Sequence, residues 1–373
     1  MNFAFTDDQI LIRDSARGWL GDYAGPAHAR KVMATEAGYD PALWAEAVAL
    51  GWTGVIVPEA QGGLGLGFVE LAILAEEMGR ALYPSPFEAT IAYAANALLA
   101  AGCGRFLEDI ATGSLTATLA AGNALGQVVA RAEGGGWRLD GVMRHVPDGA
   151  RADLILVAAV LSGRLALFAV PGNTAGLARI GLATMDQTRR PAELRFENVV
   201  VGADALLAEG VEAALTLALD RAAVAHAAWS VGAAEACLDM TVEYTKGRVQ
   251  FGRPVAGFQA VKHQCADMAL AVETSRSAAY WAACVADDTG PNGDGTALSL
   301  AASGAKSWCA RAYFDCAATA IQLHGGVGFT WEYDVHLYFK NARALEATSG
   351  DPAFHRERVA QLIGLDDPAE AAQ

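Results

Sequence analysis

The stretch YTKGRVQFGRPVAGFQ, residues 244–259, separates two long helical segments and decides how this chain folds. Its first residues continue a helix, and Gly252 and Pro254 then interrupt the helical pattern, so the chain turns back here. The turn holds Arg248 and Arg253, whose guanidinium groups and neighbouring backbone N–H groups suit an anion such as a pyrophosphate. A solvated basic helix end that complements the helix dipole explains the same residues equally well.

A second stretch, QLHGGVGFT at residues 322–330, directly follows another long helical segment. Its three glycines let a backbone approach a ligand closely, and the side chain of Gln322 can donate a hydrogen bond to that ligand. Glycine also ends helices for capping alone, and this simpler interpretation remains open for the stretch taken by itself.

Three kinds of pattern follow one another along the chain. Helical periodicity comes first, with a capping box at residues 6–9 and an N-cap followed by proline at Asp40-Pro41. Short β-rich runs separated by turns come next and predict antiparallel strands. Long amphipathic helices then return at about 211–246, 258–287 and 296–323, with shorter ones to about 363. We expect an α+β multidomain protein with an N-terminal α-helical domain at 1–113, a middle antiparallel β domain at 114–204 and a C-terminal four-helix bundle at 205–373.

Composition and charge exclude several classes of protein. The 373 residues are too many for one simple core, and 53% hydrophobic residues with 18% charged ones describe a compact chain. A net charge of −15 argues against nucleic acid or an anionic membrane as the main partner. Acids at Asp7 and Asp8 do not suit a signal peptide, and no apolar run is long enough to span a bilayer, so we expect a cytoplasmic protein. Six cysteines without a C-x-x-C pair predict buried reduced thiols and no metal site.

Together and in this order, the motifs resemble the acyl-CoA dehydrogenase family, in particular the divergent subunits of its actinobacterial and steroid-type members. The basic corner matches the family at Arg248, Phe251-Gly252 and Phe258-Gln259, the glycine-rich motif at Gln322, Gly325, Gly326 and Gly328, and the N-terminal motif at Leu50-Gly51-Trp52, Pro58-Glu59 and Gly62-Gly63. The resemblance covers nearly the whole chain. It implies that two motifs reach across a dimer interface to the pyrophosphate and adenosine of a neighbouring subunit's FAD. The residues implied in FAD binding are Arg248, Phe251, Gln259, Gln322, Gly325 and Gly326.

The same resemblance implies the reaction and the partners. A carboxylate removes the α-proton of an acyl-CoA thioester while the flavin accepts the β-hydride, and the flavin supplies the difficult step. The implied partners are the acyl-CoA substrate, an electron-transfer flavoprotein as acceptor, and further subunits in a homo- or hetero-oligomer, as a dimer or a tetramer. A bulky or steroid-derived acyl group is the implied substrate.

The sequence departs from the family pattern in the middle domain. The family has a Trp-x-Thr strand beside the flavin ring, and this chain has Arg144-His145-Val-Pro147 at that place. In the preceding segment, from Thr118 to Asn123, this chain lacks residues that the family pattern contains. Pro147 cannot donate a backbone hydrogen bond, and His145 cannot present an indole surface. We therefore expect the chain's own flavin seat to be altered.

The usual catalytic glutamate is also replaced, because Ser349 stands before Gly350 at its place. Some family members hold the base on the first bundle helix in a Glu-Arg pair, which aligns with Asp220-Arg221 and makes Asp220 the candidate base. An ion pair with Arg221 or with a neighbouring helix explains Asp220 equally well. Two other acids, Glu346 and Asp351, are weaker candidates, since Asp351 precedes a proline as an N-cap does.

Three functions remain open at this point. The chain is an FAD-dependent acyl-CoA dehydrogenase subunit, active alone or with a paired subunit; or a non-catalytic partner that completes another chain's flavin site; or a flavin oxidase or monooxygenase on the same fold. No motif marks an oxygen-activating site, so the third hypothesis is the weakest.

Overall fold

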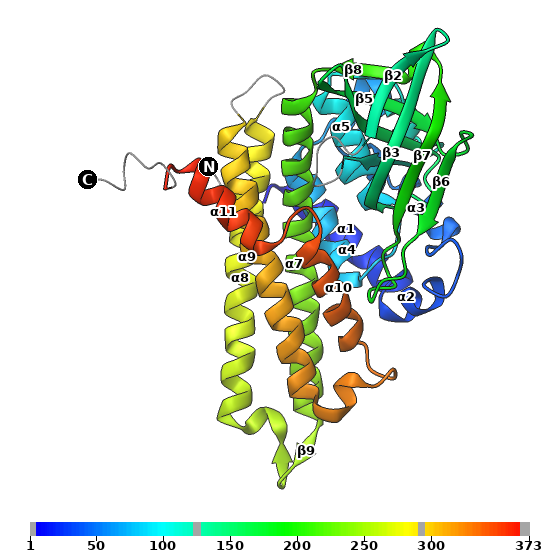
Figure 1. Ribbon diagram of the computed structural model, residues 1–373. Coiled ribbons are helices and arrows are strands. Elements are labelled where there is room, and N and C mark those ends of the chain that lie inside the picture. Colours follow the sequence, from blue (N-terminus) through cyan, green and yellow to red (C-terminus); the bar gives the residue numbers. More distant parts are fainter. Residues whose placement is uncertain (1–4, 122–127, 290–294, 366–373) are drawn as a thin grey trace.

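The computed structural model describes residues 5–121, 128–289 and 295–365, and its elements follow the expected order of helices, strands and helices (Figure 1). The N-terminal region consists of α1 (Asp7–Tyr23), α2 (Pro26–Val32), α3 (Pro41–Ala49), η1 (Trp52–Gly54), η2 (Glu59–Gln61), α4 (Phe68–Ala81), the π-helix η3 (Glu88–Ala95), α5 (Asn96–Ala100) and α6 (Leu107–Ala111). The capping box at Thr6 and the N-cap at Asp40 are both present, as the sequence predicts. These caps satisfy backbone N–H groups that the first turn of a helix leaves without a partner.

The middle region is an eight-stranded sheet that is mostly antiparallel. Its strands are β1 (Ala117–Ala120), β2 (Val128–Glu133), β3 (Gly136–Pro147), β4 (Leu154–Leu161), β5 (Arg164–Pro171), β6 (Leu177–Gly181), β7 (Pro191–Val201) and β8 (Leu206–Glu209), with η4 (Ala203–Ala205) before the last. The expectation of a purely antiparallel domain needs one correction, because β4 pairs in parallel with β1 and β2. The strand β3 and residues 148–153 lie between β2 and β4, and a connection of this length permits a parallel pair where a tight hairpin does not.

The C-terminal region contains three long helices and two shorter ones. These are α7 (Glu212–Gly247), α8 (Gln259–Asp288), α9 (Thr296–His324), α10 (Val335–Ala347) and α11 (Pro352–Leu362), with the short β9 (Val249–Gln250), β10 (Arg253–Pro254), η5 (Val255–Gly257) and η6 (Gly325–Phe329) between them. In place of a fourth long helix, the chain breaks between α10 and α11, where Ser349 and Gly350 have positive φ angles of 58° and 97°. Asp351 caps α11 with Pro352 in its first turn, as predicted.

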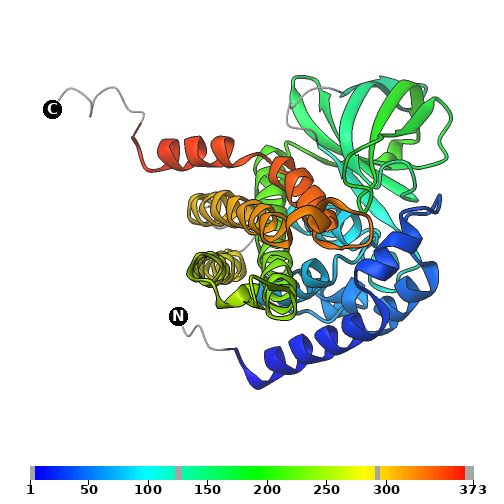
Figure 2. The same ribbon diagram turned by 90° about the horizontal axis from the view of Figure 1, so that it is seen from below.

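The N-terminal helices pack directly on the bundle through α4 and α7. In Figure 2, α7 lies in the middle of the molecule, between α8 and α9 on one side and the β domain with the N-terminal helices on the other. Gly79 and Gly232 permit the close approach of α4 and α7, because a Cβ atom at either position would overlap a backbone carbonyl of the facing helix. One apolar cluster therefore runs from the N-terminal helices through the bundle, and a second fills the β domain.

All six cysteines are free, and three of them are buried while Cys103, Cys265 and Cys284 are partly exposed. Within residues 5–121, 128–289 and 295–365, no helix has both the length and the apolar character needed to cross a bilayer.

Candidate active site

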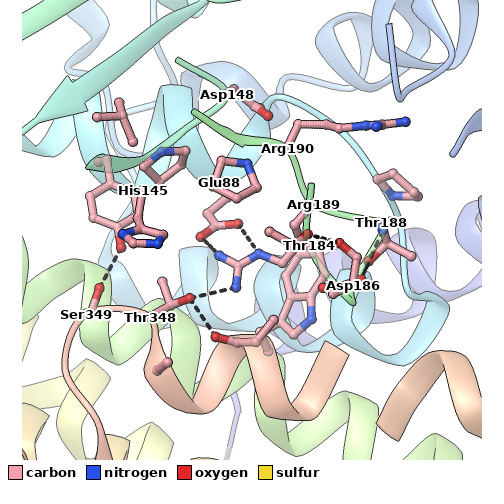
Figure 3. Close-up of a pocket in the computed structure, with 18 of the residues that line it drawn as sticks. Glu88, His145, Asp148, Thr184, Asp186, Thr188, Arg189, Arg190, Thr348 and Ser349 are labelled. Atoms are coloured by element: carbon pink, nitrogen blue, oxygen red, sulfur yellow. Dashed lines mark hydrogen bonds and ion pairs between the residues drawn. The ribbon is translucent and has the colours of Figure 1, made fainter. Parts of the chain in front are cut away.

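A cavity of about 690 Å³ lies where the three regions of the chain meet (Figure 3). Its lining comes from residues 82–85, 88 and 93 of the N-terminal region, residues 119, 121, 144–148, 151, 184–186 and 188–191 of the β domain, residues 219 and 229 of α7, and residues 340, 343, 344 and 347–349 in and after α10. A concave site of this size at a junction of domains is where ligands usually bind.

The inner wall of the cavity is built around Glu88, the first residue of the π-helix η3. Its Oε2 atom accepts a hydrogen bond of 3.1 Å from Nε of Arg189, and its Oε1 atom lies 2.9 Å from Nε2 of His226. Burial raises the pKa of Glu88, but the charge of Arg189 and the hydrogen bond from His226 outweigh it, so the pKa falls to about 2. Arg189 also donates to Oγ1 of Thr348 at 2.9 Å, which links the β domain to the end of α10. Glu88 is thus an ionised, paired carboxylate and a poor proton acceptor.

Beside this network, the hydroxyl groups of Tyr93 and Ser349 lie 2.5 Å apart. Burial, together with the negative charge of Glu88, raises the pKa of Tyr93, so its hydroxyl stays protonated at neutral pH. Ser349, which the resemblance predicts at the position of the family's glutamate, lines the cavity. Figure 3 shows Ser349 on the same side of the cavity as His145.

Backbone strain is concentrated around this cavity. Leu82, His145, Asp148 and Ser349 all line it, and all four have positive φ angles, between 49° and 58°. A residue other than glycine keeps such an angle only where its surroundings hold it, and these positions gather at functional sites. His145 lies in a register shift of the β3–β7 pairing, between Met143 and Val146, and its side chain is exposed.

Two further acids, Asp148 and Asp186, line the cavity. Burial raises the pKa of Asp148 to about 6, although Arg151 beside it opposes the change. Asp186 accepts hydrogen bonds from the hydroxyl of Thr188 at 2.7 Å and from Nδ2 of Asn341 at 3.0 Å, and burial raises its pKa. Both carboxyl groups are therefore engaged in contacts within the chain.

The structure places Asp220, the predicted base, outside the cavity lining. Its Oδ2 atom accepts hydrogen bonds from Oγ of Ser299 at 2.6 Å and from Nη2 of Arg358 at 2.9 Å. Arg358 belongs to α11, so the ion pair joins α7 to a neighbouring helix. This geometry favours the structural alternative for Asp220, and it pairs with Arg358 rather than with Arg221. The weaker candidates are also engaged, since Glu346 pairs with an arginine of α10 and is not among the lining residues.

The residues predicted to bind FAD gather at a different place, the end of the bundle that carries β9 in Figure 1. The rings of Tyr244 and His324 stack there at 4.3 Å between centroids, which brings the ends of α7 and α9 together. Arg248 and Gln322 are exposed, and within the described residues neither side chain makes a hydrogen bond or an ion pair. Gln259, the first residue of α8, is exposed as well.

This end of the bundle presents large apolar side chains to solvent. Phe251 is 92% exposed, Phe329 is 77% exposed and Trp331 is 56% exposed. Gly326 is exposed, has no unusual φ angle, and has open space where a Cβ atom would stand. The fold itself therefore gives no reason for glycine at 326, whereas Gly325 caps α9 with φ of 64°. An uncovered apolar surface beside unpaired donors is typical of a contact with another subunit.

Comparison with known proteins agrees with the motifs. The family model described as "Acyl-CoA dehydrogenase, C-terminal domain" matches residues 208–364, and the one described as "Acyl-CoA dehydrogenase, N-terminal domain" matches residues 6–114. Acyl-CoA dehydrogenase IpdE2 of Mycobacterium tuberculosis is 38% identical over 339 residues, which are 90% of this chain and 91% of that protein. The chain belongs to the acyl-CoA dehydrogenase family. The resemblance read from the sequence is thereby confirmed.

Solved structures of other acyl-CoA dehydrogenases have the same fold. A variant of the Tcur3481–Tcur3483 steroid ACAD has a TM-score of 0.86 at 32% identity, with 98% of this chain and 99% of that chain covered. The ChsE4–ChsE5 complex from Mycobacterium tuberculosis has a TM-score of 0.89 at 27% identity, with 99% and 100% covered. The expected fold of an N-terminal helical domain, a central β domain and a C-terminal helical domain is confirmed, with the parallel pairs of β4 as the detail that differs.

Sequence reasoning missed Glu88, Tyr93 and Arg189, which line the cavity, and His226, which lies 2.9 Å from Glu88. The doublet Arg189-Arg190 in an acidic chain is a signal that could have indicated this region, and the sequence analysis did not use it. The remaining partners come together only in the fold, because 101 residues separate Glu88 from Arg189 and 138 separate it from His226.

Proposed function

We propose that this chain is one subunit of a cytoplasmic, FAD-dependent acyl-CoA dehydrogenase that assembles with a second, different chain. The complex oxidises the α,β bond of a bulky or steroid-derived acyl-CoA and passes electrons to an electron-transfer flavoprotein. Family membership supports the reaction, and the names of the related steroid ACAD and of the ChsE4–ChsE5 complex support the substrate class and the mixed assembly.

The observation that carries this proposal is the separation of two partial sites in one chain. The donors and glycines of the cofactor motifs lie at an uncovered end of the bundle, and none of them lines the chain's own cavity. Arg248 and Gln322 have unpaired donors, and the backbone at Gly326 is open, so these residues fit the phosphates of a dinucleotide held by a neighbouring subunit. When bound, the flavin supplies the hydride acceptor.

The chain's own cavity supports a mixed rather than a uniform oligomer. Its carboxyl groups at Glu88, Asp148 and Asp186 are all engaged with partners, and Ser349 has no carboxylate to accept an α-proton. Asp220 would have to leave Arg358 and reach the cavity before it acted as the base. A second subunit that keeps the glutamate meets this need without rearrangement.

A second candidate function follows from the same contacts. If neither Asp220 nor another acid of this chain takes the proton, the chain is a non-catalytic partner that completes the flavin site of its neighbour. The ion pair of Asp220 supports this alternative, because it leaves that carboxylate engaged with Arg358.

The test is the flavin content of the assembled oligomer purified from the native host, measured by its absorbance spectrum. Arg248→Ala should lower the flavin content, because it removes charge-assisted hydrogen bonds worth about 1.5–3 kcal/mol. Arg164→Ala is the matched control, since Arg164 is an exposed arginine on the β domain. Full flavin occupancy in Arg248→Ala would remove the support for a cofactor contact at this end of the bundle.

A further inference from the structure

The hydroxyl groups of Tyr93 and Ser349 form an isolated pair on the inner wall of the cavity. Tyr93 comes from the π-helix η3, and Ser349 comes from the loop after α10, so the two meet across 256 residues of sequence. Both residues line the cavity, and Figure 3 shows the bond from Ser349 as a dashed line. Short π-helical segments are rare and often occur at functional sites.

The hydrogen bonds of this pair leave one proton unused. Two hydroxyl groups carry two protons, and the bond of 2.5 Å between them uses one, whichever group is the donor. Within the described residues, neither hydroxyl has another hydrogen-bond partner. One O–H group is therefore available to a molecule in the cavity.

The neighbouring polar groups are already committed. The carboxylate of Glu88 accepts from Arg189 and His226, and the hydroxyl of Thr348 accepts from Arg189 while it donates to the carbonyl oxygen of Ala344 at 3.0 Å. The Tyr93–Ser349 pair differs from them because its hydrogen-bonding capacity is not exhausted inside the chain.

Two side chains, from α9 and α11, hold the backbone around Ser349 in place. Nζ of Lys306 donates to the carbonyl oxygen of Gly350 at 3.1 Å, and Nε2 of His355 donates to the carbonyl oxygen of Ser349 at 2.8 Å. These contacts hold the backbone of Ser349 at its positive φ of 58°, and the hydrogen bond with Tyr93 positions its hydroxyl. A group held in advance loses little conformational entropy when it binds a ligand.

We propose that Tyr93 and Ser349 form a donor subsite for an oxygen atom on the acyl group, so that the cavity selects an oxygenated acyl thioester over a plain hydrocarbon one. The inference rests on the proposed function, because it takes the ligand to be an acyl-CoA. A keto or hydroxyl oxygen fits, since both accept a hydrogen bond from a neutral O–H group. A hydrocarbon chain at this wall would bury the same O–H without a partner, which is unfavourable.

The experiment compares acyl-CoA ligands that differ only in that oxygen. Dissociation constants of cyclohexanecarboxyl-CoA and of its 3-oxo and 4-oxo derivatives are measured by isothermal titration calorimetry on the purified oligomer. The wild type should bind at least one oxo derivative about tenfold more tightly than the parent compound, as expected for one buried hydrogen bond. The double variant Tyr93→Phe/Ser349→Ala should bind all three compounds equally.

Single variants and a control separate the subsite from general damage to the cavity. Each single variant keeps one hydroxyl, so the preference should persist only in the variant whose remaining hydroxyl reaches the ligand. Thr90→Val is the control, because it removes a buried hydroxyl of the same π-helix that donates to Ala117 and does not line the cavity. It should keep the full preference.

The possible outcomes separate a failure of the subsite from a failure of the proposed function. No preference in the wild type, or a preference that survives in the double variant, would overturn the subsite and leave the dehydrogenase proposal standing. Failure of all three ligands to bind the wild-type oligomer would count against the proposed function itself, and the subsite would fall with it.

Discussion

Lys306 on α9 is the group whose removal should affect the loop beside the cavity most directly. Its side chain is fully buried, and its Nζ atom donates to the carbonyl oxygens of Leu345 at 3.1 Å, Glu346 at 3.2 Å and Gly350 at 3.1 Å. Leu345 and Glu346 belong to the end of α10, and Gly350 directly follows Ser349 in the loop before α11. A buried ammonium therefore satisfies acceptors that the helix end leaves free.

The free energy of this arrangement depends on pH. Burial, with a further contribution from the charge of Arg189, lowers the pKa of Lys306 from 10.5 to about 8. Between pH 8 and 10.5 the unfolded chain binds more protons than the folded chain, so the contribution of Lys306 to stability rises with pH in this window. The difference between 10.5 and 8 corresponds to about 3 kcal/mol, of which about 2 kcal/mol falls between pH 7.5 and 9.5.

The perturbation is Lys306→Met, which keeps the length of the stem and removes the titrating group. Urea unfolding at pH 7.5, 8.5 and 9.5, at constant ionic strength and one protein concentration, gives the free energy of unfolding of each protein. The value for the wild type minus that for the variant should rise by about 2 kcal/mol across the range. Lys31→Met, at an exposed lysine of α2, is the control and should show no such rise. A flat difference for Lys306→Met would refute the reasoning.

Two further changes test how the helices are held together. Asp220→Asn should lower the free energy of unfolding by about 3 kcal/mol, because it leaves a mostly buried arginine of α11 without its partner, whereas Asp315→Asn in an exposed pair on α9 should cost less than about 0.5 kcal/mol. Equal effects in denaturant titrations would contradict a structural role for Asp220. Gly232→Ala should lower the thermal midpoint by several degrees, since the new Cβ atom overlaps a carbonyl of α4, while Gly304→Ala, which meets open space on α9, should raise it slightly. A Gly232→Ala protein as stable as the wild type would show that α4 and α7 are not in close contact.

Local signals determined a large part of this structure. The predicted first bundle helix, 211–246, is observed as Glu212–Gly247, and the N-caps at Asp40 and Asp351 are where a polar residue before proline predicted them. Such signals act over a few residues, because a cap or a helical period depends on neighbours one or two turns away. The order of the motifs then identified the family without any coordinates.

Local sequence signals could not predict the direction of strand pairing or the partners of Asp220. Short β-rich runs predicted strands, but the parallel pairing of β4 depends on which strands the chain brings together over long connections. Asp220 looked equally suited to catalysis and to an ion pair, and the distinction required the position of Arg358, 138 residues further along the chain.

The sequence by itself therefore determined the order of the helical and β regions, the boundaries of the long helices and the two motifs that are predicted to bind the cofactor. Only the tertiary structure decided that these motifs lie at an uncovered end of the bundle, while Glu88, Tyr93, Arg189 and Ser349 gather around a separate cavity. The physical reason is that helical period and capping depend on neighbouring residues, whereas a buried charge or hydroxyl takes as its partner whichever group the packing of distant segments brings within hydrogen-bonding distance.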